Sequence, residues 1–204
     1  SVKAIWEKLR KEPDMVLGLG TGTTVEHFCS EMTNMLADGE FAQIAVSSLR
    51  TQRFLEKRGI QSVLMRDVSK IDIYLDGVDY IDTDGIYLKG GGGAMTGERL
   101  CIDMAERFEI LVHKKDASKK CVAHLSPAMP LVIEVVSWAR ASLGRRILSL
   151  GGRPILRDQK TELDNDIIDC YGLSYANATE MESTIAQCCG VVGHGLFAKK
   201  KPDT

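Results

Sequence analysis

The chain has 204 residues, of which 44% are apolar and 26% charged, a composition that excludes disordered and fibrous proteins and fits a soluble globular one. Its formal net charge of −2 excludes the overall basic field that draws proteins to nucleic acids or anionic membranes. The sequence has no run of the roughly 18 apolar residues that span a bilayer, so we expect neither a nucleic-acid partner nor a membrane partner.

The first half of the chain alternates helical and strand patterns. A helix is predicted over residues 2–11, and the apolar strand MVLGLG follows Pro13. Val25, Phe28, Met32 and Leu36 then recur at helical spacing. Further strands are predicted at 44–48, 62–65, 71–77 and 107–116, and a helix at 49–59. This alternation predicts an open, mostly parallel sheet covered by helices on both faces.

The pattern changes at about Pro127. Strands are predicted at 130–136, 154–157 and 166–175, and helices at 137–152 and 178–190. We therefore predict an α/β fold with two domains. These are an α/β catalytic domain over 1–126 and a smaller α+β domain over 127–204, with a return of the last residues to the first domain left open.

The six cysteines form no CxxC pair and share no spacing with histidines that is typical of a zinc site. Free, mostly buried thiols are expected, which favours a cytoplasmic location. The histidines are also scattered. We predict no metal and no other cofactor.

The first candidate motif is the segment Gly18-Leu-Gly-Thr-Gly-Thr-Thr24, between a predicted strand and a helix start. Unpaired backbone NH groups and the positive end of the helix dipole favour an anion there, and glycines let an oxygen approach closely. The segment lacks the lysine of a GxxxxGK[ST] loop and the GxGxxG spacing. It indicates phosphate binding or, alternatively, only a tight turn.

The second motif is Asp76-Gly-Val-Asp79, at the carboxyl end of a predicted strand, where open α/β sheets bind their ligands. A solvated turn is its plain alternative, since aspartate and glycine are common turn residues.

The third motif begins at Lys89, continues through four glycines and reaches Glu98. Such a run is costly in chain entropy, and flexible linkers seldom stand between a buried strand and a helix. Its NH groups are predicted to form a concavity for a developing oxyanion. Glu98 begins the predicted helical segment 98–108, where a first-turn glutamate is common without any catalytic role.

Together, the three motifs resemble the signature of the type A ribose-5-phosphate isomerases: a GTGST-like loop, a DGADE-like strand end and a KGGGA segment followed by a glutamate. The resemblance covers about residues 16–198 and includes DASK, EVVSWAR, LGGRPILR and GVVGHGLFA. Two departures stand out. Tyr80 replaces the glutamate after DGAD, and TELDN replaces TDNGN.

The resemblance implies aldose–ketose isomerisation of a sugar phosphate in the pentose phosphate pathway. It implies that Glu98 matches the proton acceptor and that residues 76–79 and 89–92 line the sugar. In the mechanism expected for this reaction, Lys89 and glycine NH groups meet the charge that develops on the sugar oxygen. Asp76 and Asp79 open the ring and shuttle hydroxyl protons, and the sequence leaves open which aspartate does which. The substrate-binding positions are Thr21, Gly22, Thr23, Thr24, Gly77, Val78, Gly90, Gly91, Gly92 and Lys119.

Two rival interpretations remain. A sugar-phosphate sensor of the same fold needs no general base, and a coenzyme A transferase relative would use a glutamate as nucleophile. The intact set of Asp76, Asp79, Lys89 and Glu98 favours the enzyme. A homodimer is expected only because dimers are the commonest symmetric assemblies.

Overall fold

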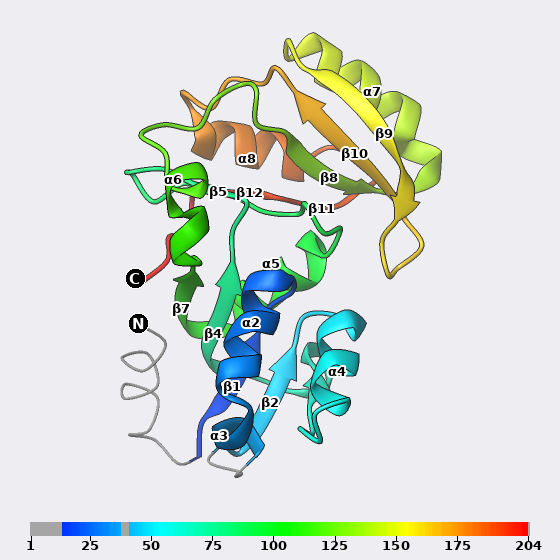
Figure 1. Cartoon of the computed structure of the whole chain (residues 1–204). Coiled ribbons are helices and arrows are strands. Elements are labelled where there is room, and N and C mark those ends of the chain that lie inside the picture. The colour runs from blue at the N-terminus through cyan, green and yellow to red at the C-terminus, as the bar shows by residue number, and fades with distance from the viewer. Residues whose placement is uncertain (1–13, 38–40, 204) are drawn as a thin grey trace. The chain divides into compact units, whose positions relative to one another are not determined.

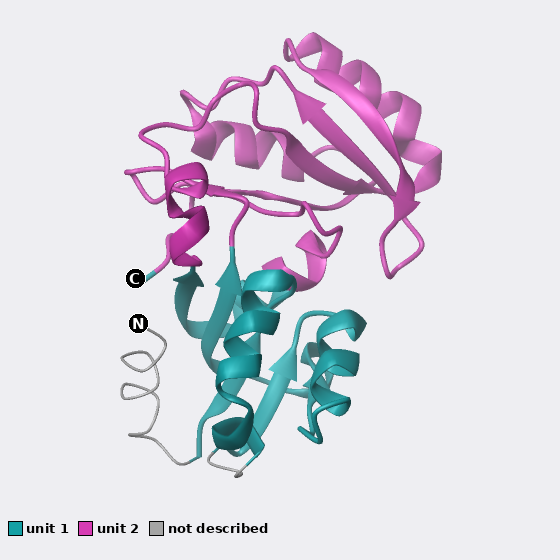
Figure 2. Ribbon diagram, in the orientation of Figure 1, with its two compact units in different colours: residues 1–77, 100–111, 203–204 teal, residues 78–99, 112–202 magenta. Residues whose placement is uncertain are grey.

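The computed structural model describes residues 14–37 and 41–203, so the helix predicted over 2–11 lies outside the described residues. The chain divides into two compact units (Figure 2). Unit 1 comprises residues 1–77, 100–111 and 203–204, and unit 2 comprises residues 78–99 and 112–202. Unit 2 thus contains residues on both sides of position 127, and the two-domain division at 126/127 stays a prediction.

Unit 1 contains a five-stranded sheet in the order β3-β2-β1-β4-β7, and every neighbouring pair is parallel (Figure 1). Its strands are β1 (Val16–Leu19), β2 (Gln43–Val46), β3 (Val63–Leu64), β4 (Ile71–Gly77) and β7 (Ala105–Leu111). The strand order reverses between β1 and β4, so the loops after these two strands lie where open α/β sheets bind ligands. The predicted parallel sheet is confirmed.

Helices α2 (Thr23–Glu31), α3 (Thr33–Ala37) and α4 (Leu49–Glu56) belong to the same unit. The helix predicted through Leu36 is interrupted at Met32, although its four apolar residues are all buried in the core with β1, β2 and β4. The Thr33 hydroxyl donates to the carbonyl of Cys29, a local bond that competes with the regular helix pattern. A short 3₁₀ turn, η1 (Met65–Asp67), follows β3.

Unit 2 contains two antiparallel sheets. One has the order β12-β6-β5 and the other β11-β8-β10-β9. The strands are β5 (Tyr80–Ile81), β6 (Tyr87–Leu88), β8 (Leu131–Val135), β9 (Arg153–Lys160), β10 (Asp166–Tyr171), β11 (Val191–His194) and β12 (Leu196–Phe197).

Helices α7 (Arg140–Ser149) and α8 (Ala178–Ala186) of unit 2 pack against one side of β8. The unit also contains the short elements η2 (Lys114–Asp116), α6 (Ala117–Lys120) and η3 (Ser137–Ala139). Alternate β8 residues such as Ile133 share a core with Leu143 and Ile185, whereas Val132 packs with Met95 and Ile167. This period of two leaves the second side of β8 for the segment that begins α5.

Helix α5 (Met95–Met104) contributes its residues up to Arg99 to unit 2 and those from Leu100 to unit 1. The helical pattern predicted through Phe108 is wrong beyond Met104, because Ala105 starts β7 and pairs with Ile71. Phe108 is fully buried in that strand and stacks on Tyr74 with ring centroids 5.6 Å apart. Sheet pairing and aromatic packing therefore override the local helical pattern.

All six cysteines are free, as predicted, but only Cys29, Cys101 and Cys170 are buried. Burial raises the pKa of Cys29 and of Cys170 to about 12, which keeps both thiols protonated at neutral pH. No helix in the described parts of the chain is long and apolar enough to cross a membrane.

Candidate active site

The loop after β1 reaches the start of α2 through Gly22, whose φ of 118° is accessible mainly to glycine. The first bond of α2 runs from the Glu26 NH to the Gly22 carbonyl, and no side chain caps the helix. The amides of Thr23 and Thr24 therefore keep the unpaired character of a helix start. This is the anion-binding geometry that the sequence predicts for residues 21–24.

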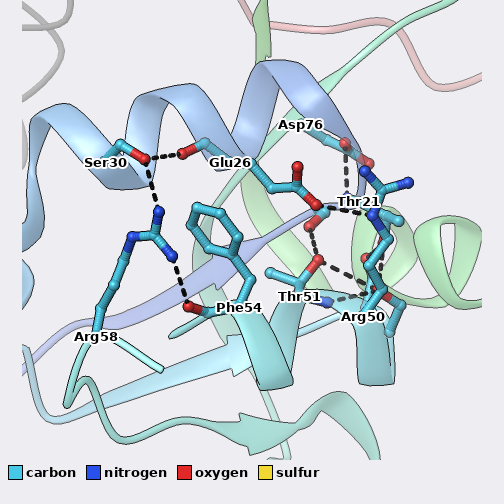
Figure 3. Close-up of polar contacts among 11 residues, drawn as sticks. Thr21, Glu26, Ser30, Arg50, Thr51, Phe54, Arg58 and Asp76 are labelled. Atoms are coloured by element: carbon cyan, nitrogen blue, oxygen red, sulfur yellow. Dashed lines mark hydrogen bonds and ion pairs between the residues drawn. The ribbon is translucent and has the colours of Figure 1, made fainter. Parts of the chain in front are cut away.

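Side chains from α4 and its preceding turn hold Thr21 in place (Figure 3). The Thr21 hydroxyl lies 2.9 Å from the Ser47 hydroxyl and donates to Ser48 over 2.7 Å. Thr51 donates to the Gly20 carbonyl, also over 2.7 Å. These residues were not identified from the sequence, since serine and threonine at a helix start look like ordinary capping residues.

Asp76 is fully buried at the end of β4 and is bonded to the same loop. Its Oδ1 accepts from the amides of Thr21 and Gly77, and its Oδ2 accepts from the Tyr74 hydroxyl over 2.7 Å. A Cβ atom on Gly20 would lie 1.9 Å from the Asp76 carboxyl carbon, so only glycine fits there. Within unit 1, Asp76 thus fixes the loop that carries Thr21 (Figure 3).

Asp79 is in a different environment, although only three positions separate it from Asp76. It is half-buried, its amide donates to the Leu88 carbonyl, and its Oδ2 accepts from the Gly91 amide over 2.8 Å. Val78, which precedes it, is buried, and the Val78 carbonyl accepts from the Lys120 ammonium. The structure therefore joins the second motif to the glycine run inside unit 2.

Lys89 and Glu98 form a buried ion pair. The Lys89 Nζ lies 3.4 Å from the Glu98 Oε1, and the two side chains are 3% and 6% exposed. The Lys89 amide donates to the Gly195 carbonyl, and a Cβ on Gly195 would lie 1.9 Å from the Lys89 carbonyl oxygen. A charged pair shielded from water in this way interacts strongly with any charge that develops beside it.

The residues around Glu98 fix the first turn of α5. Thr96 donates to the buried Glu134 carboxylate, which also accepts from Thr161 and Asn165. Thr161 and Asn165 are the first and last residues of TELDN, so the altered residues between them leave this contact intact. The α5 start is therefore tied to β8.

Arg99 ties the same turn to the C-terminal segment of unit 2. It pairs with Glu182 over 3.0 Å, donates to the carbonyls of His194 and Leu196, and lies over the Phe197 ring at 4.0 Å. Burial, together with the neighbouring Arg99 charge, lowers the pKa of His194 to about 3. His194 is therefore neutral at physiological pH and adds no charge to this network.

Backbone groups of the glycine run already form hydrogen bonds within the protein. Gly90 and Gly93 have φ values of 101° and 80°, and the Gly93 amide donates to the Gly90 carbonyl across a tight turn. The Gly91 amide is bonded to Asp79, whereas the Gly92 amide has no protein acceptor in the described part of the chain. Two of the amides predicted to receive an oxyanion thus already have protein acceptors.

A surface pocket of about 360 Å³ joins several of these elements within unit 2. Its lining includes Asp79 and Gly91, together with the cationic side chains of Lys119, Lys120 and Arg157. Tyr80, Pro130 and Val132 complete the lining. One carboxylate among three cations favours an anionic ligand. Lys119 was predicted from the sequence, whereas Lys120 and Arg157 were not assigned a role.

Comparison with known proteins places the chain in a family. Residues 43–204 match the family model described as ribose 5-phosphate isomerase A (phosphoriboisomerase A). The chain belongs to this family. "Ribose-5-phosphate isomerase A" of Haemophilus influenzae (strain 86-028NP) is 35% identical over 191 residues, which cover 93% of this chain and 84% of that protein.

Solved structures show the same likeness. The crystal structure of ribose 5-phosphate isomerase A from Neisseria gonorrhoeae matches with a TM-score of 0.88 and 28% identity, covering 99% of this chain and 86% of that one. A D-ribose-5-phosphate isomerase in complex with phospho-erythronic acid matches with a TM-score of 0.85 and 28% identity, covering 98% and 90%. These matches confirm the predicted fold class.

Proposed function

We propose that this chain interconverts D-ribose 5-phosphate and D-ribulose 5-phosphate. The buried Lys89–Glu98 pair carries the proposal, because it places a carboxylate base in the first turn of α5 with a cation 3.4 Å away. The names of the relatives support this substrate. Phospho-erythronic acid, bound to one of them, carries a planar carboxylate next to a hydroxyl-bearing carbon, as an enediolate-like ligand would.

The proposed reaction moves one proton between neighbouring carbons. Glu98 takes the proton from C2 of the open-chain aldose, and the electrons pass to the C1 carbonyl to give a cis-enediolate. The protonated Glu98 then returns the proton to C1, while the proton of the C2 hydroxyl passes to the C1 oxygen, which leaves a hydroxyl at C1 and a ketone at C2. The negative charge therefore leaves the carboxylate as it appears on the sugar oxygen.

The Lys89 ammonium can stabilise the negative charge both before and after it moves to the sugar oxygen. In the resting enzyme its ammonium pairs with Glu98. When Glu98 becomes neutral, the same ammonium compensates the enediolate oxygen without a new charge entering the site. The Gly92 amide is a second candidate donor for that oxygen.

The two aspartates receive different roles. Asp76 is fully buried and bonded to Thr21, Gly77 and Tyr74, so we assign it to the shape of the loop. Asp79 lines the pocket, and we assign it to ring opening and to proton transfer among the sugar hydroxyls. This resolves, as a proposal, the choice that the sequence left open.

The remaining residues are assigned to binding. Hydroxyl and amide donors to substrate oxygens come from the loop before α2 and its first turn, at Thr21, Gly22, Thr23 and Thr24. Lys119 is exposed at the pocket and meets the phosphate. Gly77, Val78 and the glycines at 90–92 line the sugar. We further propose a cytoplasmic homodimer that acts in the pentose phosphate pathway and needs no metal or other cofactor.

A direct assay tests the proposed function. The purified chain should convert ribose 5-phosphate to ribulose 5-phosphate, and ribose without the phosphate should be a very poor substrate, because remote binding energy orients the reacting carbons. Saturable binding of ribose 5-phosphate without turnover would instead identify a sensor. Exchange of acyl groups between coenzyme A and an acid would identify a transferase.

The substitution Asp79→Asn should separate ring opening from proton transfer. Ribulose 5-phosphate cannot form a furanose, because its C5 oxygen carries the phosphate, so Glu98 can exchange its C1 proton without ring opening. We expect turnover of ribose 5-phosphate to fall by about 100-fold, the scale of losing a general acid–base group. Deuterium from the solvent should still enter C1 of ribulose 5-phosphate at a rate within a few-fold of wild type.

NMR of the ketose in D₂O measures that exchange. Asp84→Asn is a matched control, because Asp84 is an exposed aspartate on the turn that follows β5. Loss of exchange in parallel with turnover would show that Asp79 serves the enediolate step itself.

A further inference from the structure

Arg157 on β9 is fixed by a bidentate ion pair. Its Nε and one terminal nitrogen each donate over 2.6 Å to the two carboxylate oxygens of Asp169 on β10. The two side chains are 18% and 14% exposed. Two parallel charge-assisted bonds leave the guanidinium little rotational freedom, so the direction of its remaining nitrogen is set by the sheet.

That remaining nitrogen reaches the glycine run. It donates to the Gly91 carbonyl over 3.0 Å and to the Gly90 carbonyl over 3.3 Å. Gln159, two positions along β9, lies 3.5 Å from the Gly92 carbonyl. Three successive carbonyls of the loop therefore face side chains of the same strand.

One peptide unit connects Arg157 with Asp79. The Gly90 carbonyl and the Gly91 amide belong to the same planar group, in which C=O and N–H point in opposite directions. The carbonyl accepts from Arg157 and the amide donates to the Asp79 carboxylate over 2.8 Å. A hydrogen-bonded cation on one side of a peptide also strengthens the donor on the other side.

We propose that Arg157, held by Asp169, is a positioning residue that orients the peptide between Gly90 and Gly91 and thereby places the Asp79 carboxylate for ring opening. This inference rests on the proposed function, because Asp79 has its role only in that reaction.

Geometry also argues against direct binding of substrate by Arg157, although it lines the pocket. Nε makes one bond, one terminal nitrogen makes one and the other makes two, so four donor interactions are made within the protein. A guanidinium has five N–H groups. Lysine cannot replace it, because one ammonium cannot hold both carboxylate oxygens and two carbonyls in a planar fork.

The test compares Arg157→Lys with wild type. We expect kcat for ribose 5-phosphate to fall by about 10- to 100-fold, the scale of a small misplacement of a reacting group, while KM changes by less than about threefold. Deuterium exchange at C1 of ribulose 5-phosphate should stay close to wild type, as for Asp79→Asn. In the double variant Arg157→Lys/Asp79→Asn the losses should not add, because both act through one carboxylate.

Asp169→Asn should give a smaller fall in kcat of the same kind. An asparagine side chain has only one acceptor oxygen, so it cannot accept both hydrogen bonds from the Arg157 guanidinium. Arg153→Lys is the control: Arg153 is exposed on the same strand and its guanidinium lies 5.5 Å from the Tyr171 ring. Its kinetics should match wild type. Guanidinium ion added to an Arg157→Ala enzyme should restore part of the lost turnover.

The outcomes separate this inference from the proposed function. A wild-type chain that does not isomerise ribose 5-phosphate overturns the function. With an active wild type, an Arg157→Lys enzyme of unchanged kcat overturns the inference. So does a raised KM with normal kcat, which would make Arg157 a substrate contact, and so does equal loss of turnover and deuterium exchange, which would make it a general structural support.

Discussion

Glu98→Gln should lower kcat by about 100-fold or more while the fold and substrate binding persist, because glutamine keeps the shape of the side chain but cannot accept the proton. The same variant should lose deuterium exchange at C1 of ribulose 5-phosphate. Both effects follow from the single step that we propose for Glu98. Steady-state kinetics and NMR of the ketose in D₂O measure them on the same preparation.

The buried ion pair makes a folding control necessary. Replacing Glu98 leaves the Lys89 ammonium beside a neutral amide, and loss of one partner of a buried pair costs about 3–5 kcal/mol of stability. Kinetics should therefore be measured well below the unfolding temperature, with circular dichroism to show a folded enzyme. Glu180→Gln is the matched control, because Glu180 is an exposed glutamate in the first turn of α8. A Glu98→Gln enzyme within a few-fold of wild-type turnover would remove Glu98 as the base.

Local patterns were sufficient to predict much of the fold. A parallel strand that is buried on both sides is a short apolar run, and a glycine turn followed by helical spacing marks the start of α2. Strands of the smaller α+β domain were also predicted, since the segments 130–136 and 166–175 contain β8 and β10. The patterns failed at two places. The distant pairing of Ala105 with Ile71 ends α5 early. A local bond from the Thr33 hydroxyl to the Cys29 carbonyl competes with the helix between α2 and α3.

In the candidate site, contacts between residues close in the sequence could be predicted, whereas contacts between distant residues could not. Lys89, the glycine run and Glu98 lie within ten residues, so their proximity could be read from the sequence. Arg157 donates to glycine carbonyls 66 and 67 positions away, and no local pattern indicates that contact. The different environments of Asp76 and Asp79 could not be predicted from the sequence for a related reason. The two aspartates flank the same short segment, so the sequence does not distinguish them. Their hydrogen bonds do, since Asp76 binds Tyr74 and Thr21, and Asp79 binds Gly91.

In the proposed mechanism, the two lysines differ in when their partners become negative. Lys119 is proposed to contact the phosphate, which is charged throughout the reaction, so its replacement should chiefly weaken substrate binding. Lys89 is proposed to contact an oxygen that gains charge only as the enediolate forms. An interaction made only in the transition state affects kcat and kcat/KM together.

Lys89→Ala should therefore lower kcat and kcat/KM together, by about 100- to 1000-fold, the range for loss of one donor to a developing oxyanion, while KM barely changes. It should also lower stability, because Glu98 remains buried, so melting temperatures must accompany the kinetics. Lys115→Ala, which removes an exposed lysine from the same unit, should leave turnover and KM unchanged. Assays over a full substrate range decide the matter. A folded Lys89→Ala enzyme with normal kcat and a raised KM would mean that Lys89 holds a group already charged in the ground state, and the charge compensation of the enediolate would then fall to the Gly92 amide and its neighbours.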